Sequence, residues 1–124
     1  MNLPENLLYT NDHEWLRVEG DFAYLGITEF AQNQLGDIIF LEIETLGETL
    51  NQGDIFGSIE AVKTVSDLFL PIDAEVIEVN EKILETPETI NQDPYENGWI
   101  VMIRILNSEQ LNDLLSANDY KNVI

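Results

Sequence analysis

Short stretches of alternating polar and apolar residues recur at close spacing along this chain, and their shortness constrains the fold more than any other feature. They occupy residues 13–20, 22–27, 38–44, 55–60, 65–71, 74–80 and 99–106. Period-two stretches of this length, separated by Gly, Pro, Asn and Asp, predict β-strands. Six or seven short strands within 124 residues predict a mainly β fold, a small sandwich or barrel with helical additions, in a single domain of residues 1–124.

Two segments depart from this pattern and have the 3.6-residue spacing of helices. The internal one begins after Thr28, which is placed to cap its first turn, and Gly36 is placed to end it. The other covers residues 108–124 and is predicted as one amphipathic helix with Ser108 as its N-cap. A further helical turn is predicted at residues 82–84 inside a loop region.

The chain is strongly acidic, because 24 Asp and Glu accompany only five Lys and Arg, for a formal net charge of −19. Such a surface repels phosphate backbones and anionic lipid, so neither nucleic acid nor a membrane is an expected partner. Basic patches on other proteins suit it better, although solubility alone would also explain the charge. With no Cys and a single His, His13, we expect neither catalytic residues nor a bound metal.

No secretory signal, Arg-rich transit peptide or apolar run of membrane-spanning length is recognisable in the sequence. We therefore expect a cytoplasmic protein of a bacterium, or a protein of the mitochondrial matrix if this is the processed form of a eukaryotic chain.

One of the five scarce cations, Lys63, lies between two predicted strands. The hairpin tip would hold Val62 and Lys63 rather than the Asn-Gly or Asp-Gly pairs that favour tight turns, so these side chains are expected to serve another purpose. A surface lysine paired with Glu60 or Asp67 is the simplest interpretation of the local pattern. Those carboxylates favour the ammonium form, which argues against a Schiff-base nucleophile. An exposed lysine is better suited to acylation by another enzyme, which leaves a long flexible arm.

Six motifs, in order and at ordinary spacing, give the chain a specific resemblance. They are HEW (13–15), GITEFAQNQLGD (26–37), EAVKTVSD (60–67), EVIEVN (75–80), INQDPYENGW (90–99) and LLSANDY (114–120). Through them the chain resembles, from end to end, the H proteins of the glycine cleavage system, a family of lipoyl-bearing carriers. The resemblance implies a barrel-sandwich hybrid like that of lipoyl domains, with lipoic acid joined by an amide to Lys63 through the action of a lipoate-attaching enzyme.

The resemblance also implies a non-catalytic carrier that serves three enzymes. A pyridoxal-phosphate-dependent glycine decarboxylase (P protein) would load an aminomethyl group and release carbon dioxide. A tetrahydrofolate-dependent aminomethyltransferase (T protein) would take the one-carbon unit and release ammonia. Dihydrolipoamide dehydrogenase (L protein) would reoxidise the dithiol. Transient contacts with several enzymes predict a monomer.

The family further implies a cleft on the carrier that shelters the loaded arm. Asp12, Glu14 and Asp67 are predicted to bind the amine of that arm through charge-assisted hydrogen bonds, the alternative being that they merely solvate strand ends. Glu60 and Asp67 are predicted to help the modifying enzyme recognise the tip. Ala74 stands where many relatives have glycine, which predicts strain if that turn needs a positive φ.

Two other functions are compatible with the sequence. One is a different carrier: a biotinyl domain, a lipoyl module of a 2-oxoacid dehydrogenase, or a donor that passes lipoyl groups to other enzymes. Val62 and Thr64 stand where biotinyl tips usually have Met, and a lone lipoyl module would lack the HEW motif and the C-terminal helix. The other is an unmodified acidic protein that only binds partners.

Overall fold

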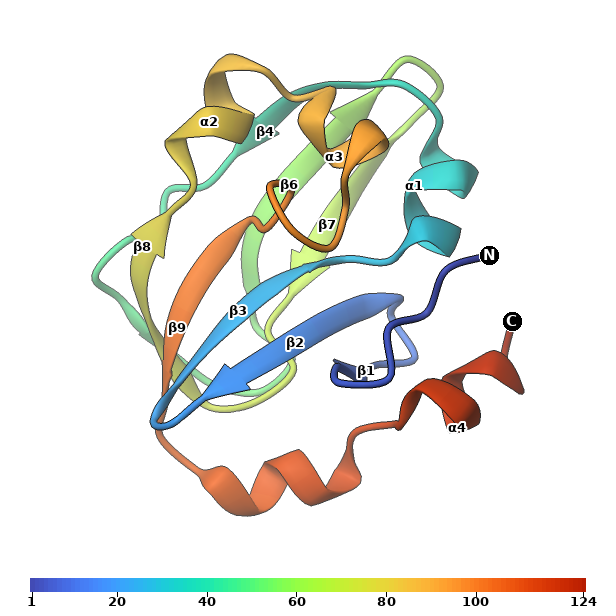
Figure 1. Ribbon diagram of the computed structural model, residues 1–124. Coiled ribbons are helices and arrows are strands. Elements are labelled where there is room, and N and C mark those ends of the chain that lie inside the picture. The colour runs from blue at the N-terminus through green and yellow to red at the C-terminus, as the bar shows by residue number, and fades with distance from the viewer.

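The chain folds into two antiparallel sheets with short helices around them, as seen in a computed structural model that describes residues 1–124 (Figure 1). The larger sheet has the strand order β1 (Leu8–Tyr9), β2 (Glu14–Glu19), β3 (Phe22–Ile27), β9 (Val101–Ile105), β8 (Ala74–Val79) and β5 (Thr49–Leu50). The smaller one has the order β4 (Ile38–Glu42), β6 (Ile55–Ala61) and β7 (Val65–Phe69). The mainly β prediction is confirmed, and the pairings form two sheets rather than one closed barrel.

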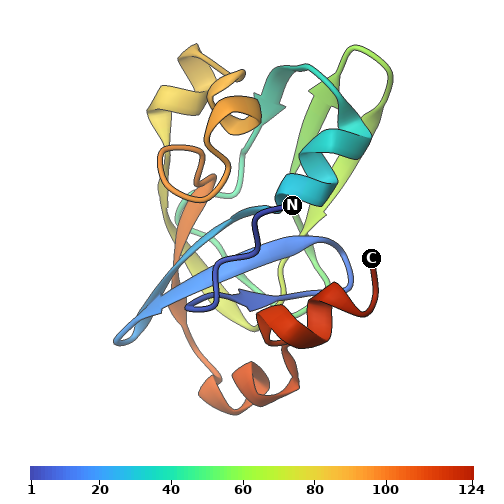
Figure 2. The same ribbon diagram turned by 45° about the vertical axis from the view of Figure 1, so that its right-hand side comes forward.

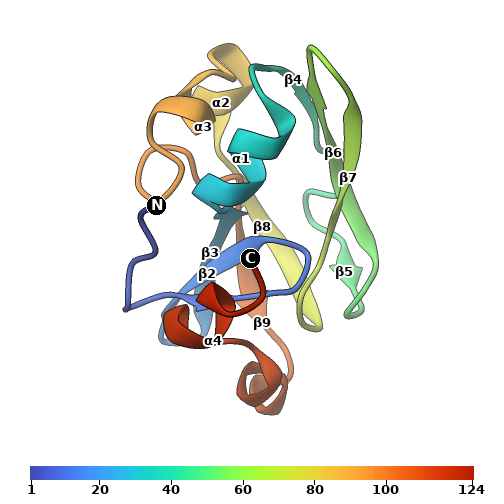
Figure 3. The same ribbon diagram turned by 90° about the vertical axis from the view of Figure 1, so that its right-hand side faces the viewer.

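The two sheets share one hydrophobic core. It contains 18 buried apolar residues from both sheets, among them Leu16 and Leu25 of the larger sheet and Leu41 and Ile59 of the smaller. In β8 and β9 alternate residues, Ala74 and Val76 in one and Val101 and Ile103 in the other, point into the core, as the period-two pattern predicts. The smaller sheet is therefore packed against the larger one through this core, and its β6–β7 hairpin runs along one side of the molecule (Figure 3).

Helix α1 (Glu29–Leu35) follows its predicted signals closely. The Thr28 side chain accepts a hydrogen bond of 3.2 Å from the Ala31 N–H, and Gly36, with φ of 79°, donates its N–H to the Gln32 carbonyl. The helix lies beside the outer half of the β6–β7 hairpin (Figures 2 and 3). α1 thus forms a wall next to the hairpin tip.

The remaining helices are short and only partly predictable. Helix α2 (Glu81–Glu85) confirms the helical turn expected near Lys82. Helix α3 (Thr89–Gln92) was not expected in the loop region, and its single turn is too short to show a period. Strands β1 and β5 were missed for the same reason, since each has two residues.

The single C-terminal helix predicted for residues 108–124 is wrong. The segment contains a 3-10 helix, η1 (Ser108–Asp113), and a separate helix, α4 (Ala117–Lys121). Between them Leu115 exchanges two backbone hydrogen bonds of 2.8 Å with Tyr9, and this pairing with β1 stops the first helix. The cap of η1 is Asn107 rather than Ser108, and Ser116 caps α4 by accepting from the Asp119 N–H.

The condition for strain at Ala74, a positive φ, is not met. It is fully buried as the first residue of β8, where it pairs with Ile105 and Leu50. A positive φ occurs at only one residue other than glycine, His13, at 65°. Alanine at position 74 therefore serves as a small core residue in a strand.

Candidate functional site

Lys63 stands at the tip of the β6–β7 hairpin. Glu60 pairs with Val65, and the Ala61 N–H donates to the Thr64 carbonyl at 2.8 Å, which leaves Val62 and Lys63 as the two exposed tip residues. The predicted strand–tip–strand arrangement is confirmed. The alternative pairing of Lys63 with an acidic neighbour is not formed, since every ion pair in the structure involves Arg17 or Arg104.

The tip is anchored to the end of α1 through the backbone. The Val62 N–H donates to the Asp37 carbonyl at 3.0 Å. Asn91 of α3 holds the adjoining turn from the other side, donating to the Gly36 carbonyl at 2.9 Å and accepting from the Ile38 N–H at 3.0 Å. The position of the lysine is therefore determined by a hydrogen-bonded unit that also contains the end of α1.

A cavity of about 150 Å³ lies beside α1 and β7, and it brings together three of the residues predicted from the sequence. Asp12, Glu14 and Asp67 all line it, although the first two are more than 50 positions from the third. Its other lining residues are His13, Ile27, Ala31, Gln34, Leu35, Ile59, Ser66 and Leu68. The cavity combines apolar walls with three acidic groups, which suits a ligand that has an apolar body and a cationic end.

Glu14 is the most unusual of these acids. Its side chain is almost wholly buried, with 2% of the residue exposed. Oε2 accepts the Phe69 N–H at 3.0 Å, whereas Oε1 is buried without any hydrogen-bond partner. Burial raises the pKa of Glu14 to about 8; the charge of Asp12 adds to the shift and the bond from Phe69 opposes it. The raised pKa favours the protonated carboxyl of Glu14 at neutral pH, and one oxygen of this carboxyl has no hydrogen-bond partner in the protein.

The loop before β2 holds the acids of the cavity in place. The Thr10 hydroxyl accepts the backbone N–H groups of both Asp12 and Glu14, at 3.2 Å each. His13, in its left-handed conformation, stacks on Phe30 with ring centroids 4.8 Å apart. The hydrogen bonds to Thr10 and the stacking on Phe30 support the unusual backbone conformation of His13. Its two neighbours in the chain, Asp12 and Glu14, both line the cavity.

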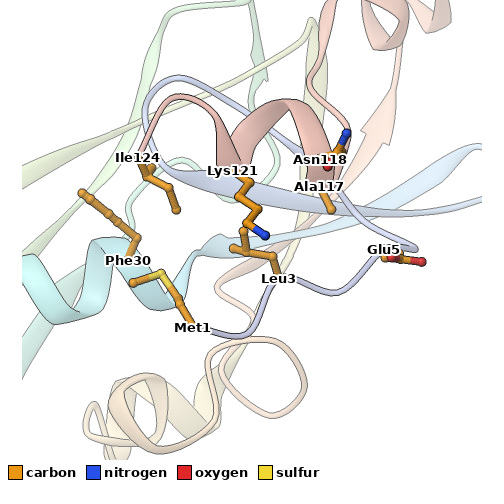
Figure 4. Close-up of a pocket in the computed structure, with 8 residues that line it drawn as sticks. All are labelled: Met1, Leu3, Glu5, Phe30, Ala117, Asn118, Lys121 and Ile124. Carbon is orange, nitrogen blue, oxygen red and sulfur yellow. The ribbon is translucent and has the colours of Figure 1, made fainter.

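The 150 Å³ cavity is not the largest hollow of the surface. A groove of about 660 Å³ lies between the two chain ends and α1, where Lys121 reaches toward Leu3 (Figure 4). It contains none of the predicted site residues. No group of three or more His, Asp and Glu side chains is placed to hold a metal ion, and no helix is long and apolar enough to cross a bilayer.

The sequence and the fold of the chain both match those of a known protein family. The family model described as glycine cleavage H-protein matches residues 7–124. The chain belongs to the glycine cleavage H-protein family. The resemblance carried by the six motifs is thereby confirmed, and membership supports a carrier role in the glycine cleavage system alongside the other components of that system.

Individual H proteins resemble the chain over nearly its whole length. The glycine cleavage system H protein of Bacteroides thetaiotaomicron is 56% identical over 124 residues, which cover all of this chain and 98% of that protein. The H protein of Halothermothrix orenii is 48% identical over 97% of this chain and 94% of its own. The crystal structure of an H protein from Mycobacterium marinum superposes with a TM-score of 0.87 at 36% identity, covering 96% of both chains.

Several residues that line the cavity were not singled out as site residues from the sequence. Gln34 and Ser66 contribute polar groups to the cavity, and His13, the single histidine of the chain, forms part of its wall. All three residues lie within shared motifs, Gln34 in the longest of them, and this was the one signal that the sequence offered for them. Glu60, by contrast, is exposed on the outer face of the smaller sheet and does not line the cavity with the other acids.

Proposed function

We propose that this chain is a lipoyl-bearing carrier of aminomethyl groups whose arm is attached to Lys63. The supporting observation is the combination of an exposed, unpaired lysine at a hydrogen-bonded hairpin tip with a cavity lined by Glu14, whose buried Oε1 has no hydrogen-bond partner. Residues 1–124 would form the single carrier domain. When attached, the lipoyl group would supply the disulfide that accepts the aminomethyl group as a thioether.

The residues of the cavity fit the amine of a loaded arm. A protonated amine that entered would approach the free Oε1 of Glu14 and the carboxylates of Asp12 and Asp67. Its positive charge would lower the pKa of Glu14, so that this carboxyl ionises and makes a charge-assisted hydrogen bond. The apolar walls would exclude water from the arm, which protects the aminomethyl group from hydrolysis. We infer that this is how the carrier keeps its cargo between enzymes.

The acids near the tip have a second proposed role. Glu60 and Asp67 are exposed on the strands that flank Lys63, and neither forms an ion pair. They are therefore available to basic groups of the lipoate-attaching enzyme, which must select this lysine among the few in the chain.

The proposed cycle involves three enzymes. Glycine decarboxylase loads the arm, the tetrahydrofolate-dependent aminomethyltransferase unloads it, and dihydrolipoamide dehydrogenase restores the disulfide. The acidic surface favours transient contacts with basic patches on these proteins, which supports a monomeric carrier. The relatives described above come from bacteria, which supports the bacterial cytoplasm as its location.

Lys63→Arg tests the proposal, since it keeps the charge and removes the amine that forms the amide. Wild-type protein expressed with lipoate ligase and lipoate should gain the mass of one lipoyl group, and Lys63→Arg should gain none. With glycine decarboxylase, the variant should lose all glycine-dependent carbon dioxide exchange while its circular dichroism stays unchanged.

Lys82→Arg, on helix α2, is the matched control and should behave as wild type. Carbon dioxide exchange retained by Lys63→Arg would remove Lys63 from the function. A mass increase equal to biotin would identify a different class of carrier.

A further inference from the structure

The side chain of Lys63 lies against Gly36, directly after the last residue of α1. A Cβ atom at position 36 would lie 2.9 Å from Cε of Lys63 and 3.6 Å from its Nζ. Nonbonded carbon atoms do not approach as closely as 2.9 Å, so any side chain at this position would displace the lysine. The space in which the lysine stem rests therefore exists because residue 36 has no side chain.

This resting place lies between the tip and the cavity. Gly36 follows Gln34 and Leu35, and both of these residues line the 150 Å³ cavity. A stem that crosses Gly36 thus brings Nζ, the atom to which an acyl group would be joined, alongside the helix end that forms the cavity wall. An arm that left the tip in another direction would extend into solvent.

The contact is supported by the backbone around it. The carbonyl of Gly36 accepts from Asn91, and the carbonyl of the next residue, Asp37, accepts from the N–H of Val62 at the tip. Gly36 and Lys63 are thus held at a set separation by the hydrogen bonds that anchor the tip. The geometry is built into the backbone and does not depend on an ion pair of the lysine.

We propose that Gly36 is a positioning residue for the carrier arm: its missing side chain leaves a notch that directs the Lys63 stem from the hairpin tip toward the cavity. This inference rests on the proposed function and adds to it a residue that touches neither the cavity nor the acyl group. Attachment of the arm does not need the notch, whereas protection of the loaded arm does.

Gly36→Ala tests this role, and Gly53→Ala is the matched control. Both glycines have a positive φ, of 79° and 90°, so each alanine carries backbone strain. The strain is severe at Gly36, whose ψ of −153° is essentially restricted to glycine, so circular dichroism and urea unfolding of both variants must show an intact fold before their cargo release is compared. Only position 36 faces Lys63, because a Cβ at Gly53 would meet nothing within 4 Å. Both variants should accept one lipoyl group as fully as wild type, as intact mass would show, since the tip stays exposed.

The decisive measurement is the loss of cargo from carriers loaded with glycine decarboxylase and glycine and then freed of the enzyme. Water attacks the aminomethyl carbon, and the carbon–sulfur bond breaks to leave a free thiol and aminomethanol. The carbon–nitrogen bond of aminomethanol then breaks and releases ammonia and formaldehyde. Gly36→Ala should release ammonia several-fold faster than wild type, and Gly53→Ala should release it at the wild-type rate. Loading should shift the amide resonances of Gln34 and Ser66 in wild type and Gly53→Ala but not in Gly36→Ala.

Equal release from the two alanine variants would overturn the role of Gly36 and leave the proposed function standing. A wild-type chain that gains no lipoyl group would overturn both. If Gly36→Ala does not fold, the wild-type protein provides a second test. Nuclear Overhauser effects should link the Cε protons of Lys63 to the α-protons of Gly36, and their absence would overturn the inference.

Discussion

At the scale of the residue, Glu14 shows how burial changes the chemistry of a common side chain. The chain has 24 acidic residues, and most are exposed to solvent. Glu14 differs because it is buried between β2 and β7, with one oxygen bonded to Phe69 and the other without a partner. Its pKa rises from 4.5 to about 8 for that reason. A neutral carboxyl at this position would ionise when a cation binds next to it, because the positive charge lowers its pKa.

The raised pKa makes a prediction about stability. Folded protein keeps a proton on Glu14 that unfolded protein releases above pH 4.5, so the contribution of this group to stability is complete below pH 4.5 and is lost as the pH rises through about 8. The free energy of unfolding of wild type, relative to Glu14→Gln, should therefore fall between pH 5 and pH 8. Urea unfolding of both proteins across this range measures it, and parallel pH profiles would contradict the assignment.

At the scale of the element, helix α4 holds the loop that carries the cavity acids. Tyr120 is fully buried and stacks on Tyr9 at a centroid distance of 4.9 Å. Its hydroxyl group is hydrogen-bonded to both His13 Nδ1 and Thr28 Oγ1, at 2.8 Å each, donating in one bond and accepting in the other. One side chain near the C-terminus thus joins the turn at His13 to the start of α1. Both of these segments border the cavity.

Tyr120→Phe should keep the aromatic stacking and lose both hydrogen bonds. The buried Thr28 hydroxyl and the half-buried His13 Nδ1 are then left without this partner, which should lower the free energy of unfolding by about 1–3 kcal/mol. Tyr24→Phe is the control, since the Tyr24 ring packs edge-on against Trp99 and its hydroxyl group makes no hydrogen bond within the protein. Urea unfolding should show a loss only in Tyr120→Phe, and amide exchange at Asp12 and Glu14 should accelerate in the same variant. Equal losses in the two variants would refute the link.

At the scale of the whole molecule, the net charge of −19 opposes folding through repulsion among exposed carboxylates. Only three ion pairs counter it, and all three involve Arg17 or Arg104. Added salt should therefore screen more repulsion among carboxylates than attraction within ion pairs, and so should stabilise the folded protein.

Raising sodium chloride from 20 to 500 mM should increase the melting temperature, because the screening length falls from about 20 Å to about 4 Å over this range. Replacing the exposed Glu48, Glu81 and Glu109 together by Gln should weaken that dependence, as differential scanning calorimetry would measure. A melting temperature that falls with salt would mean that attractive pairs dominate.

Local sequence patterns were enough to predict the seven longer strands, helix α1 with both of its caps, and the exposed lysine between two strands. These features depend on residues close together in the chain, because alternation, capping and turn formation are properties of neighbouring residues. Each C-terminal piece is helical, yet the break at Leu115 was not foreseen, since it depends on pairing with Tyr9 more than 100 positions away.

The burial of Glu14, its raised pKa and the contact between Gly36 and Lys63 became visible only in the tertiary structure. The sequence marked Asp12, Glu14 and Asp67 as candidates through family resemblance, but it did not distinguish the buried Glu14 from the two exposed acids. Nor did it reveal that Gly36, chosen as a helix stop, also leaves room for Lys63. Burial, a raised pKa and the contact across Gly36 arise where distant segments meet, and local sequence patterns do not encode which segments those will be.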